Sequence, residues 1–410
     1  MTQIKETLEI NNKFGPFNQP FKLELAPLTV FIGPQGTGKS LISQFLYFFR
    51  DIEYLLANFT NRTTSQEMVR KIIEAIRAGE KSEQAFAPLI FDNVHITYSQ
   101  PQTEKFKRII SFLKKRYAIE PIYDFKKEIE KWLVEFRKPG VAGQVKNNAL
   151  FFPAERIFFS HVINSAPSLL GNSAISLATR HLIDFISVGV ADAHKNWQKN
   201  PRQQPEQARE IAKLVNLTLG GHATCVGNGN FKDTWQFIPS DGQMPIKIEM
   251  ASSGQMDTWP LVTSIQAIFA EETLHRPKFL HIEEPETHLH PTAQIAIVKM
   301  LAYLVNQGFH VLLTTHSLFI AYALNNLIMA HIKLGPEKNV KNMPTPQVRL
   351  APDKVTAYLF ATDGKVQNIF EDEQIDEGLL GERLSDLETE FNHLMTAPFK
   401  SSLQLQLFRE

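Results

Sequence analysis

The sequence predicts an α/β fold built on a mostly parallel core sheet, and three features carry this prediction. Strand-like and helix-like segments alternate through the first hundred residues. A glycine-rich loop at residues 33–40 stands between an apolar strand and an apolar helix. Two later apolar strands, within residues 278–286 and 310–317, run directly into polar side chains. We expect these polar strand ends to lie beside the glycine-rich loop, since parallel strands end at one edge of a sheet.

The composition is that of a folded protein without a strong charge bias. The chain has 410 residues, of which 43% are hydrophobic, so it can bury a substantial core. Lys+Arg and Asp+Glu are 43 each, which argues against a generally basic nucleic-acid binder but allows a local basic patch. Cys225 is the only cysteine, so no internal disulfide can form. The N-terminus lacks a signal-peptide core and no apolar run is long enough for a membrane span, so we expect a cytoplasmic protein.

The first half of the chain divides into short strands, one long helix and an insertion. Residues 21–33 predict two strands separated at Pro27, and residues 40–59 predict an apolar-rich helix. Residues 91–100 alternate as a strand does. Apolar residues at helical spacing within residues 103–138 predict a two-helix insertion. We expect it to contact a partner and not the site formed by the glycine-rich loop, although its apolar stripes would equally suit packing against the body of the protein.

The middle of the chain alternates helical segments with a small β region. Residues 148–159 predict a strand and a turn, and residues 165–216 predict a helical lobe. Turn signals within residues 222–250 predict an antiparallel β region that closes on a strand-like run at residues 244–250. A long helix is expected next, with Pro260 near its first turns.

The last part of the chain is predicted to complete one domain. Residues 293–308 predict a helix closed by its glycine, residues 354–369 a strand pair, and residues 384–395 an amphipathic helix. We therefore take residues 1–410 as a single domain, with a C-terminal extension at residues 336–410.

The stretch GPQGTGKS, residues 33–40, matches the phosphate-binding pattern G-x-x-x-x-G-K-[ST] in full. Its glycines let backbone N–H groups turn inward around phosphates, and the following helix N-terminus adds partial positive charge. Lys39 is expected to reach the β- and γ-phosphates, and the Ser40 hydroxyl to ligate Mg²⁺. A chance glycine-rich turn is disfavoured because strand, loop and helix agree. The predicted binding residues here are Gly33, Gly36, Thr37, Gly38, Lys39, Ser40 and Leu41.

Two strand ends supply candidate metal-binding and catalytic residues. In FLHIEEPETHLH, residues 279–290, Glu283 can hold Mg²⁺ and Glu284 can polarise a water for attack on the γ-phosphorus. In TTHS, residues 314–317, His316 can bind the γ-phosphate or orient that water. Standing alone, the acids would be more typical of a solvated turn, and the histidine of a structural role.

Three histidines near the acids raise a zinc alternative, which we disfavour. His281, His288 and His290 cluster in sequence, but no cysteine or acid partner stands at ligand spacing.

The stretch ASSGQ, residues 251–255, predicts a second anion site. It follows a strand-like run and precedes a helix, and it lacks a lysine. Its candidate nucleotide-binding residues are Ser252, Ser253, Gly254 and Gln255.

The order of these motifs resembles that of the ABC-type ATPases over roughly residues 1–327. ASSGQ stands at the family's signature, residues 287–290 at its D-loop, and His316 at its H-loop. The resemblance implies ATP and Mg²⁺ as ligands. It also implies a head-to-tail homodimer, or a higher even-numbered homo-oligomer, in which each signature caps the γ-phosphate held by the other subunit's phosphate loop.

Within that family, EEPETHLHP and PAER resemble the RecF, OLD and SMC side. Glu283 stands where most members have Asp, and over two hundred residues separate the phosphate loop from the signature. Gln35 and Thr37 also depart from the residues usual in that branch's loop. The family's Q-loop glutamine is not placed, with Gln100 and Gln102 as candidates.

The resemblance favours an ATP-hydrolysing dimerisation switch, acting as the sensor or scaffold subunit of an anti-phage defence system. About ninety residues follow His316, too few for a TOPRIM nuclease domain, so a separate effector protein such as a nuclease is expected. A RecF-like DNA-repair ATPase is the main alternative, and the basic bias of residues 105–116 is compatible with nucleic-acid binding. A non-catalytic ATP-dependent scaffold and a transporter subunit are less favoured, and no membrane partner is expected.

Overall fold

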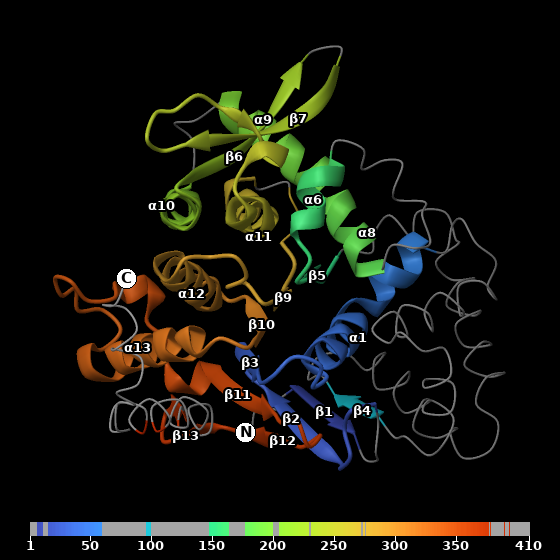
Figure 1. The fold of residues 1–410 in the computed structure, drawn as a ribbon, viewed down its shortest axis with the longest axis vertical. Coiled ribbons are helices and arrows are strands. Elements are labelled where there is room, and N and C mark those ends of the chain that lie inside the picture. Colours follow the sequence, from blue (N-terminus) through green and yellow to red (C-terminus); the bar gives the residue numbers. More distant parts are fainter. Residues whose placement is uncertain are drawn as a thin grey trace, which may run out of the picture. The chain divides into compact units, whose positions relative to one another are not determined.

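The centre of the fold is a six-stranded sheet in the order β12-β11-β3-β10-β9-β5 (Figure 1). Five strands are parallel, and β12 pairs antiparallel with β11 at one edge. The bounds are β3 (Leu28–Ile32), β5 (Ala149–Phe152), β9 (Phe279–Glu283), β10 (His310–Thr315), β11 (Val355–Phe360) and β12 (Val366–Asn368). Every residue of β3, β5 and β9 is buried, as expected when helices cover both faces of a parallel sheet. The predicted α/β class is confirmed.

The structure is a computed structural model, and it describes most of the chain outside one long segment. The described residues are 6–10, 15–59, 96–99, 147–163, 177–199, 205–228, 231–271, 274, 276–376, 378, 389 and 393. The chain divides into two units, Met1–Ile375 and Asp376–Glu410, and the fold described here is that of the first.

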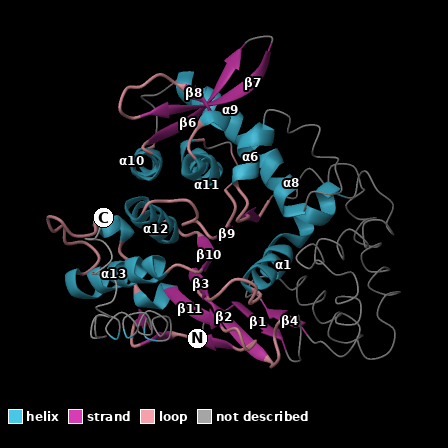
Figure 2. Ribbon diagram, viewed as in Figure 1, coloured by secondary structure: helices cyan, strands magenta, loops and turns pink. Residues whose placement is uncertain are grey.

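Helices lie on either side of the core sheet, α1 on one side and α12 and α13 on the other (Figure 1), and Figure 2 shows the same layers by element type. The longer helices are α1 (Lys39–Phe59), α10 (Glu206–Leu219), α11 (Ser253–Ala270), α12 (Pro291–Asn306) and α13 (Leu318–Leu334). The shorter ones are α6 (Ile157–Val162), α8 (Leu177–Asp184), the π-helix η3 (Phe185–Val190) and α9 (Ala191–Lys199). Pro260 lies inside α11 as predicted, and this helix is buried along most of its length.

Two three-stranded antiparallel sheets accompany the core. Their strands are β1 (Glu6–Ile10), β2 (Phe21–Leu25) and β4 (Ile96–Ser99) in one, and β6 (Gly221–Asn228), β7 (Phe231–Pro239) and β8 (Ile246–Lys247) in the other. The sequence pattern did not predict β1. The strand predicted at residues 244–250 is wrong in length, because only two residues pair with β7 and a 3-10 turn, Ile248–Met250, then leads into α11. A short hairpin, β13 (Phe370–Glu371) and β14 (Gln374–Ile375), ends the first unit.

Buried charge ties the sheet containing β1 to the core. Arg50 on α1 donates through Nε and Nη2 to the two carboxylate oxygens of Glu6, at 2.8 and 3.0 Å. Its Nη1 lies 3.1 Å from His281 Nε2 on β9, and its guanidinium lies over the Phe279 ring. Arg50 therefore fixes β1 relative to α1 and to β9.

Several sequence predictions fall on undescribed segments. The insertion at residues 103–138, the Q-loop candidates Gln100 and Gln102, and the helix at residues 384–395 lie outside the described residues except for isolated positions. The lobe at residues 165–216 is helical where described, from Leu177 onward. Among the helices that the structure describes, none is long and apolar enough to cross a bilayer.

Candidate functional site

The three chemically important strand ends meet at the carboxyl edge of the core sheet. Ile32, the last residue of β3, is in register with Thr315 of β10. Glu283, the last residue of β9, is in register with Thr314. The glycine-rich loop, the acids and His316 therefore begin side by side, as the sequence predicted, because parallel pairing aligns strands that leave the sheet in the same direction.

The loop at residues 33–40 requires glycine at two crowded positions. Gly33 has φ +148°, and a Cβ there would lie 2.2 Å from the Phe360 carbonyl oxygen on β11. Gly38 has φ +94°, and a Cβ there would lie 2.5 Å from the Phe17 ring. At these two positions β11 and the Phe17 ring leave no space for a side chain, and the positive φ values favour glycine, which adopts them without strain.

Lys39 occupies the centre of this loop. Its Nζ donates to the carbonyl oxygens of Gly33 and Pro34, at 2.7 and 2.6 Å. Burial lowers the pKa of Lys39, while the charges of Glu284, Glu286 and Glu283 oppose that shift. These three glutamates are therefore close enough to act on the charge of Lys39. The phosphate loop and the acidic end of β9 thus form one site.

The remaining predicted loop residues have defined positions. Thr37 is buried and donates from Oγ1 to the Pro34 carbonyl, 2.9 Å away, so its side chain closes the loop. Gly36 and Ser40 are exposed, and Leu41 is buried at the start of α1. Exposed positions at the loop and the helix N-terminus leave room for a phosphate chain to approach.

Glu283 and Ser40 fit a divalent cation. Glu283 is 4% exposed, and its Oε1 accepts no hydrogen bond within the described residues. Burial raises the pKa of Glu283 to about 7, while a hydrogen bond from the Ser40 side chain acts in the opposite direction. A buried carboxylate oxygen without a partner beside a hydroxyl matches the oxygen ligands that Mg²⁺ prefers. These two residues would hold the ion.

The zinc alternative finds no support among the described residues. No group of three or more His, Cys, Asp or Glu side chains there could hold a metal ion. His281 is fully buried on β9, with its ring nitrogens beside Ser43 and Arg50, at 3.3 and 3.1 Å. His281 therefore has a structural role between α1 and the core sheet.

Glu283→Gln is expected to weaken Mg²⁺ binding without destabilising the ligand-free protein. In the folded protein without ligand the Glu283 pKa is about 7, above its usual 4.5, so this group lowers stability as pH rises from about 4.5 to 7. The neutral amide lacks that effect. At pH 8 the variant without ligand should melt at or above the wild-type temperature, whereas stabilisation by Mg²⁺ with ATP should fall. Thermal melts with and without both ligands measure this, and an equal Mg²⁺ effect in both proteins would contradict the metal assignment.

Glu284 follows the strand in an unusual backbone conformation. Its φ is +42°, a left-handed value that costs a non-glycine residue roughly 1–3 kcal/mol. Two contacts hold it there, because its N–H donates to the Thr314 carbonyl at 2.8 Å and its own carbonyl accepts from Arg156 Nη2 at 3.0 Å. The side chain is partly exposed, and its Oε1 lies 3.6 Å from His316 Nδ1. The two predicted catalytic groups are therefore neighbours.

Glu286 organises the turn that carries His316, and sequence reasoning missed this residue. Its buried Oε1 accepts from the Thr315 hydroxyl and from the His316 backbone N–H. The same oxygen lies 3.7 Å from His316 Nδ1. The signal was the third acid of EEPE, but its partners on β10 are some thirty residues away in sequence.

Arg156, in the stretch PAER, is a second residue whose role was not predicted. It is fully buried and donates to the carbonyl oxygens of Pro153, Glu283 and Glu284. Its Nη2 also lies 2.8 Å from Asp257 Oδ2 on α11, and Nε donates to the Asp257 carbonyl at 3.2 Å. One guanidinium therefore joins the helix that follows the ASSGQ stretch to the backbone of both predicted site acids.

The ASSGQ stretch forms the N-terminus of α11. Ser252 is the N-cap residue: its Oγ accepts from the Gln255 N–H, and Gln255 Oε1 accepts from the Ser252 N–H. Gln255 Nε2 also donates to the Leu219 carbonyl, so this side chain already has two partners in its own chain. A Cβ at Gly254 would lie 2.6 Å from the His288 carbonyl, so glycine allows close approach to the turn at residues 287–290.

Ser252 and Ser253 are exposed, and no hydrogen bond joins described residues 252–255 to the loop at residues 33–40. The exposed helix N-terminus is thus a separate surface, capped by its own serine. Nucleotide contact by Ser252, Ser253, Gly254 and Gln255 stays a prediction.

A lysine-bearing phosphate loop beside paired acids, at the carboxyl edge of a mostly parallel sheet, defines a P-loop NTPase of ABC type. The chain belongs to the AAA ATPase domain family, whose profile matches residues 64–321. This range contains Ser252, Glu284 and His316, and the phosphate loop precedes it. The family implies nucleotide binding, for which Mg²⁺ is the usual companion.

Several solved structures align with most of the chain at low sequence identity. One is an SMC head bound to the C-winged helix domain of ScpA, with TM-score 0.46 and 14% identity, covering 92% of this chain and 99% of that one. A second, from Pyrococcus furiosus, is an SMC head domain with an extended coiled coil bound to the C-terminal domain of ScpA, with TM-score 0.43, 13% identity and coverage of 94% and 99%. A third is an ATP-binding cassette of an ABC transporter in its ADP conformation, with TM-score 0.36, 13% identity and coverage of 94% and 99%. No curated protein matches the chain.

Proposed function

We propose that this protein is an ATP-hydrolysing switch that dimerises around its nucleotide. The observation that carries the proposal is the meeting of Lys39, Glu283, Glu284 and His316 at one sheet edge. Lys39 would bind the β- and γ-phosphates, and Glu283 with Ser40 would hold Mg²⁺, whose charge would offset that of the phosphates.

Glu284 acts as the general base of the proposed reaction. Its carboxylate accepts a proton from water as the water oxygen forms a bond to the γ-phosphorus. The bond from that phosphorus to the β–γ bridging oxygen breaks, and ADP leaves with the electron pair. His316, 3.6 Å from Glu284, orients the water or the γ-phosphate. The resemblance in motif order and the geometry of these two side chains support this assignment.

The exposed N-terminus of α11 supports the proposed dimer. Ser252 and Ser253 face solvent and make no hydrogen bond to the phosphate loop of their own chain. An exposed helix N-terminus attracts phosphate, and in a two-fold head-to-tail dimer it would meet the nucleotide on the other subunit. Two composite sites would then form, each from the loop of one subunit and the ASSGQ stretch of the other.

Mixing two inactive variants tests this arrangement. Lys39→Ala should lose ATP binding, because it removes the full charge aimed at the phosphates. Ser252→Arg should bind ATP as a monomer yet lose hydrolysis, because a bulky cation replaces the small hydroxyl at the interface. Together they can assemble one complete site, so phosphate release should partly return, or an ATP-dependent heterodimer should at least form by light scattering.

Met244→Arg is the matched control for the Ser252 variant. Met244 is 84% exposed in the turn before β8, so its substitution adds the same arginine away from the site and should leave hydrolysis unchanged. If Ser252→Arg destroys ATP binding by the monomer, the ASSGQ stretch acts within its own chain and the dimer proposal is wrong. If wild-type protein binds ATP without releasing phosphate, the scaffold alternative replaces hydrolysis.

The biological setting that we propose is the sensor or scaffold subunit of an anti-phage system with a separate effector. This setting rests on the sequence resemblance to standalone ATPase subunits. Phage plating on cells that carry the gene with and without its neighbours tests it. Salt-dependent binding of duplex DNA, together with no protection against phage, would favour the RecF-like alternative.

A further inference from the structure

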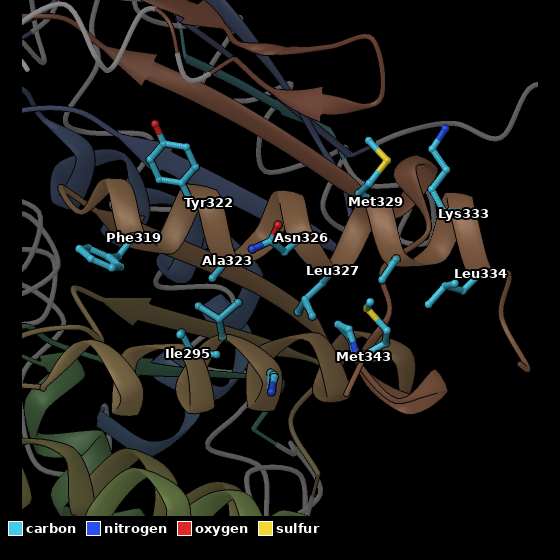
Figure 3. Close-up of a pocket in the computed structure, with 14 residues that line it drawn as sticks. Ile295, Phe319, Tyr322, Ala323, Asn326, Leu327, Met329, Lys333, Leu334 and Met343 are labelled. Carbon is cyan, nitrogen blue, oxygen red and sulfur yellow. The ribbon is translucent and has the colours of Figure 1, made fainter. Parts of the chain in front are cut away.

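Helices α12 and α13 border an open groove with a volume of about 730 Å³ (Figure 3). Residues from both helices line it, together with Met343 and Pro344 from the loop after α13. The groove extends along α13 from Phe319 to Leu334, which at 1.5 Å per residue is about 23 Å, or roughly four helical turns. These dimensions suit a helical segment.

The groove gathers exposed apolar side chains. Eleven large hydrophobic residues are exposed in the described part of the chain, and five of them line this one feature. They are Ile295, Phe319, Tyr322, Met329 and Met343, each between 41% and 54% exposed. Single exposed apolar residues are ordinary, but such a cluster marks an interaction surface.

The charged residues that line the groove are basic. Lys299 on α12 and Lys333 on α13 line it, and neither forms an ion pair within the described residues. The loop that carries Met343 also contains Lys338 and Lys341, with Glu337 as its one acidic residue. A ligand of this surface therefore gains from acidic groups beside an apolar stripe.

We propose that this groove binds an amphipathic α-helix of another protein, with an apolar stripe flanked by acidic residues. Apolar side chains at positions i, i+4, i+7 and i+11 of the helix fill the groove, as in other helix-in-groove complexes. Its acids pair with Lys299 and Lys333. A second copy of this chain fits less well, because a two-fold contact would bring the same lysines of both copies together.

The proposed partner would sit close to the nucleotide site, although the proposal does not depend on the function assigned above. Phe319 follows His316 by three residues, and α12 begins directly after the turn at residues 287–290. Gln294 links the two helix starts, since its Nε2 donates to the Leu289 carbonyl and its Oε1 lies 3.4 Å from Ser317 Oγ.

A labelled model peptide tests the proposal by fluorescence anisotropy. The probe is an amphipathic helical peptide with four leucines at the stated spacing and glutamates along both flanks. It should bind wild-type protein, whereas a scrambled peptide of the same composition should not. Phe319→Glu and Met329→Glu should each weaken binding at least about tenfold, because both place charge in the apolar groove. Met250→Glu, at a 70% exposed methionine elsewhere, is the matched control and should leave affinity unchanged.

Charge reversal supplies a second test that does not depend on the apolar substitutions folding well. The double variant Lys299→Glu with Lys333→Glu should bind the glutamate peptide more weakly and a peptide with lysine flanks more tightly. Its rate of ATP hydrolysis should stay at the wild-type value. A photoreactive residue in place of Tyr322 should cross-link to the peptide's leucine face. The proposal is overturned if charge reversal changes the affinity for neither peptide, or if phosphatidylserine vesicles bind the groove in place of the peptide. It is also overturned if the cross-link joins two copies of this chain or residues 376–410 of the same chain.

Discussion

Glu284→Gln is expected to lower ATP turnover by at least about a hundredfold while ATP binding stays intact. The amide has the size of the carboxylate, but it cannot accept the proton of the attacking water. The backbone at this position is held by Thr314 and Arg156, so the substituted side chain should keep its place beside His316. Steady-state phosphate release and calorimetric ATP titration measure the two quantities separately. The stalled variant should also accumulate as an ATP-bound dimer by light scattering.

The control for this prediction is Glu373→Gln, which makes the same chemical change at an exposed turn. It should leave turnover within about twofold of wild type, as expected of surface substitutions away from a site. Normal turnover in Glu284→Gln would show that another group accepts the proton. Loss of ATP binding would instead indicate that Glu284 shapes the phosphate site.

Arg156→Met is expected to destabilise the fold by about 3–5 kcal/mol, because it leaves the buried Asp257 carboxylate without its charged partner. Arg156 is 0% exposed and Asp257 is 1% exposed. Burial raises the pKa of Asp257, and the Arg156 charge works against that rise, so the carboxylate depends on the guanidinium. Chemical denaturation of the ligand-free protein measures the free energy of unfolding.

Pairing that change with Asp257→Leu separates stability from positioning. The double variant removes both charges and should recover much of the lost stability. Turnover should stay low, because the carbonyls of Glu283 and Glu284 still lack their donor. Arg156→Lys should also lose turnover, since an ammonium cannot reproduce the planar fork that contacts several acceptors at once. Full activity in the stable double variant would show that Arg156 serves the fold alone.

The sequence predicted the parts of the site that consecutive residues build. The loop around Lys39 needs its glycines and its lysine within eight residues, and Glu283 and His316 each follow a short apolar run. Such segments carry their own backbone requirements, so a pattern of residue types is enough to find them. The order of these segments also predicted the α/β class and the shared strand edge, since parallel pairing leaves few other arrangements.

The sequence did not predict which distant residues contact one another. Arg156 and Asp257 are 101 positions apart, and Glu286 and Thr315 are 29 apart. Nothing local in the sequence distinguishes a buried arginine that donates to four backbone carbonyls from an arginine on the surface. The length of β8 likewise depends on a separate segment, because β8 ends where its pairing with β7 ends.

By itself the sequence determined which segments could hold phosphate, bind a cation and supply a base, because those abilities belong to side chains and short backbone turns. Tertiary structure alone decided how they work together. It placed Phe360 against Gly33, set Glu284 at φ +42° beside His316, and joined the acidic strand end to α11 through one buried guanidinium. The physical reason is that each of these features needs desolvated contacts between distant segments, and such contacts exist only once the core sheet has brought the segments together.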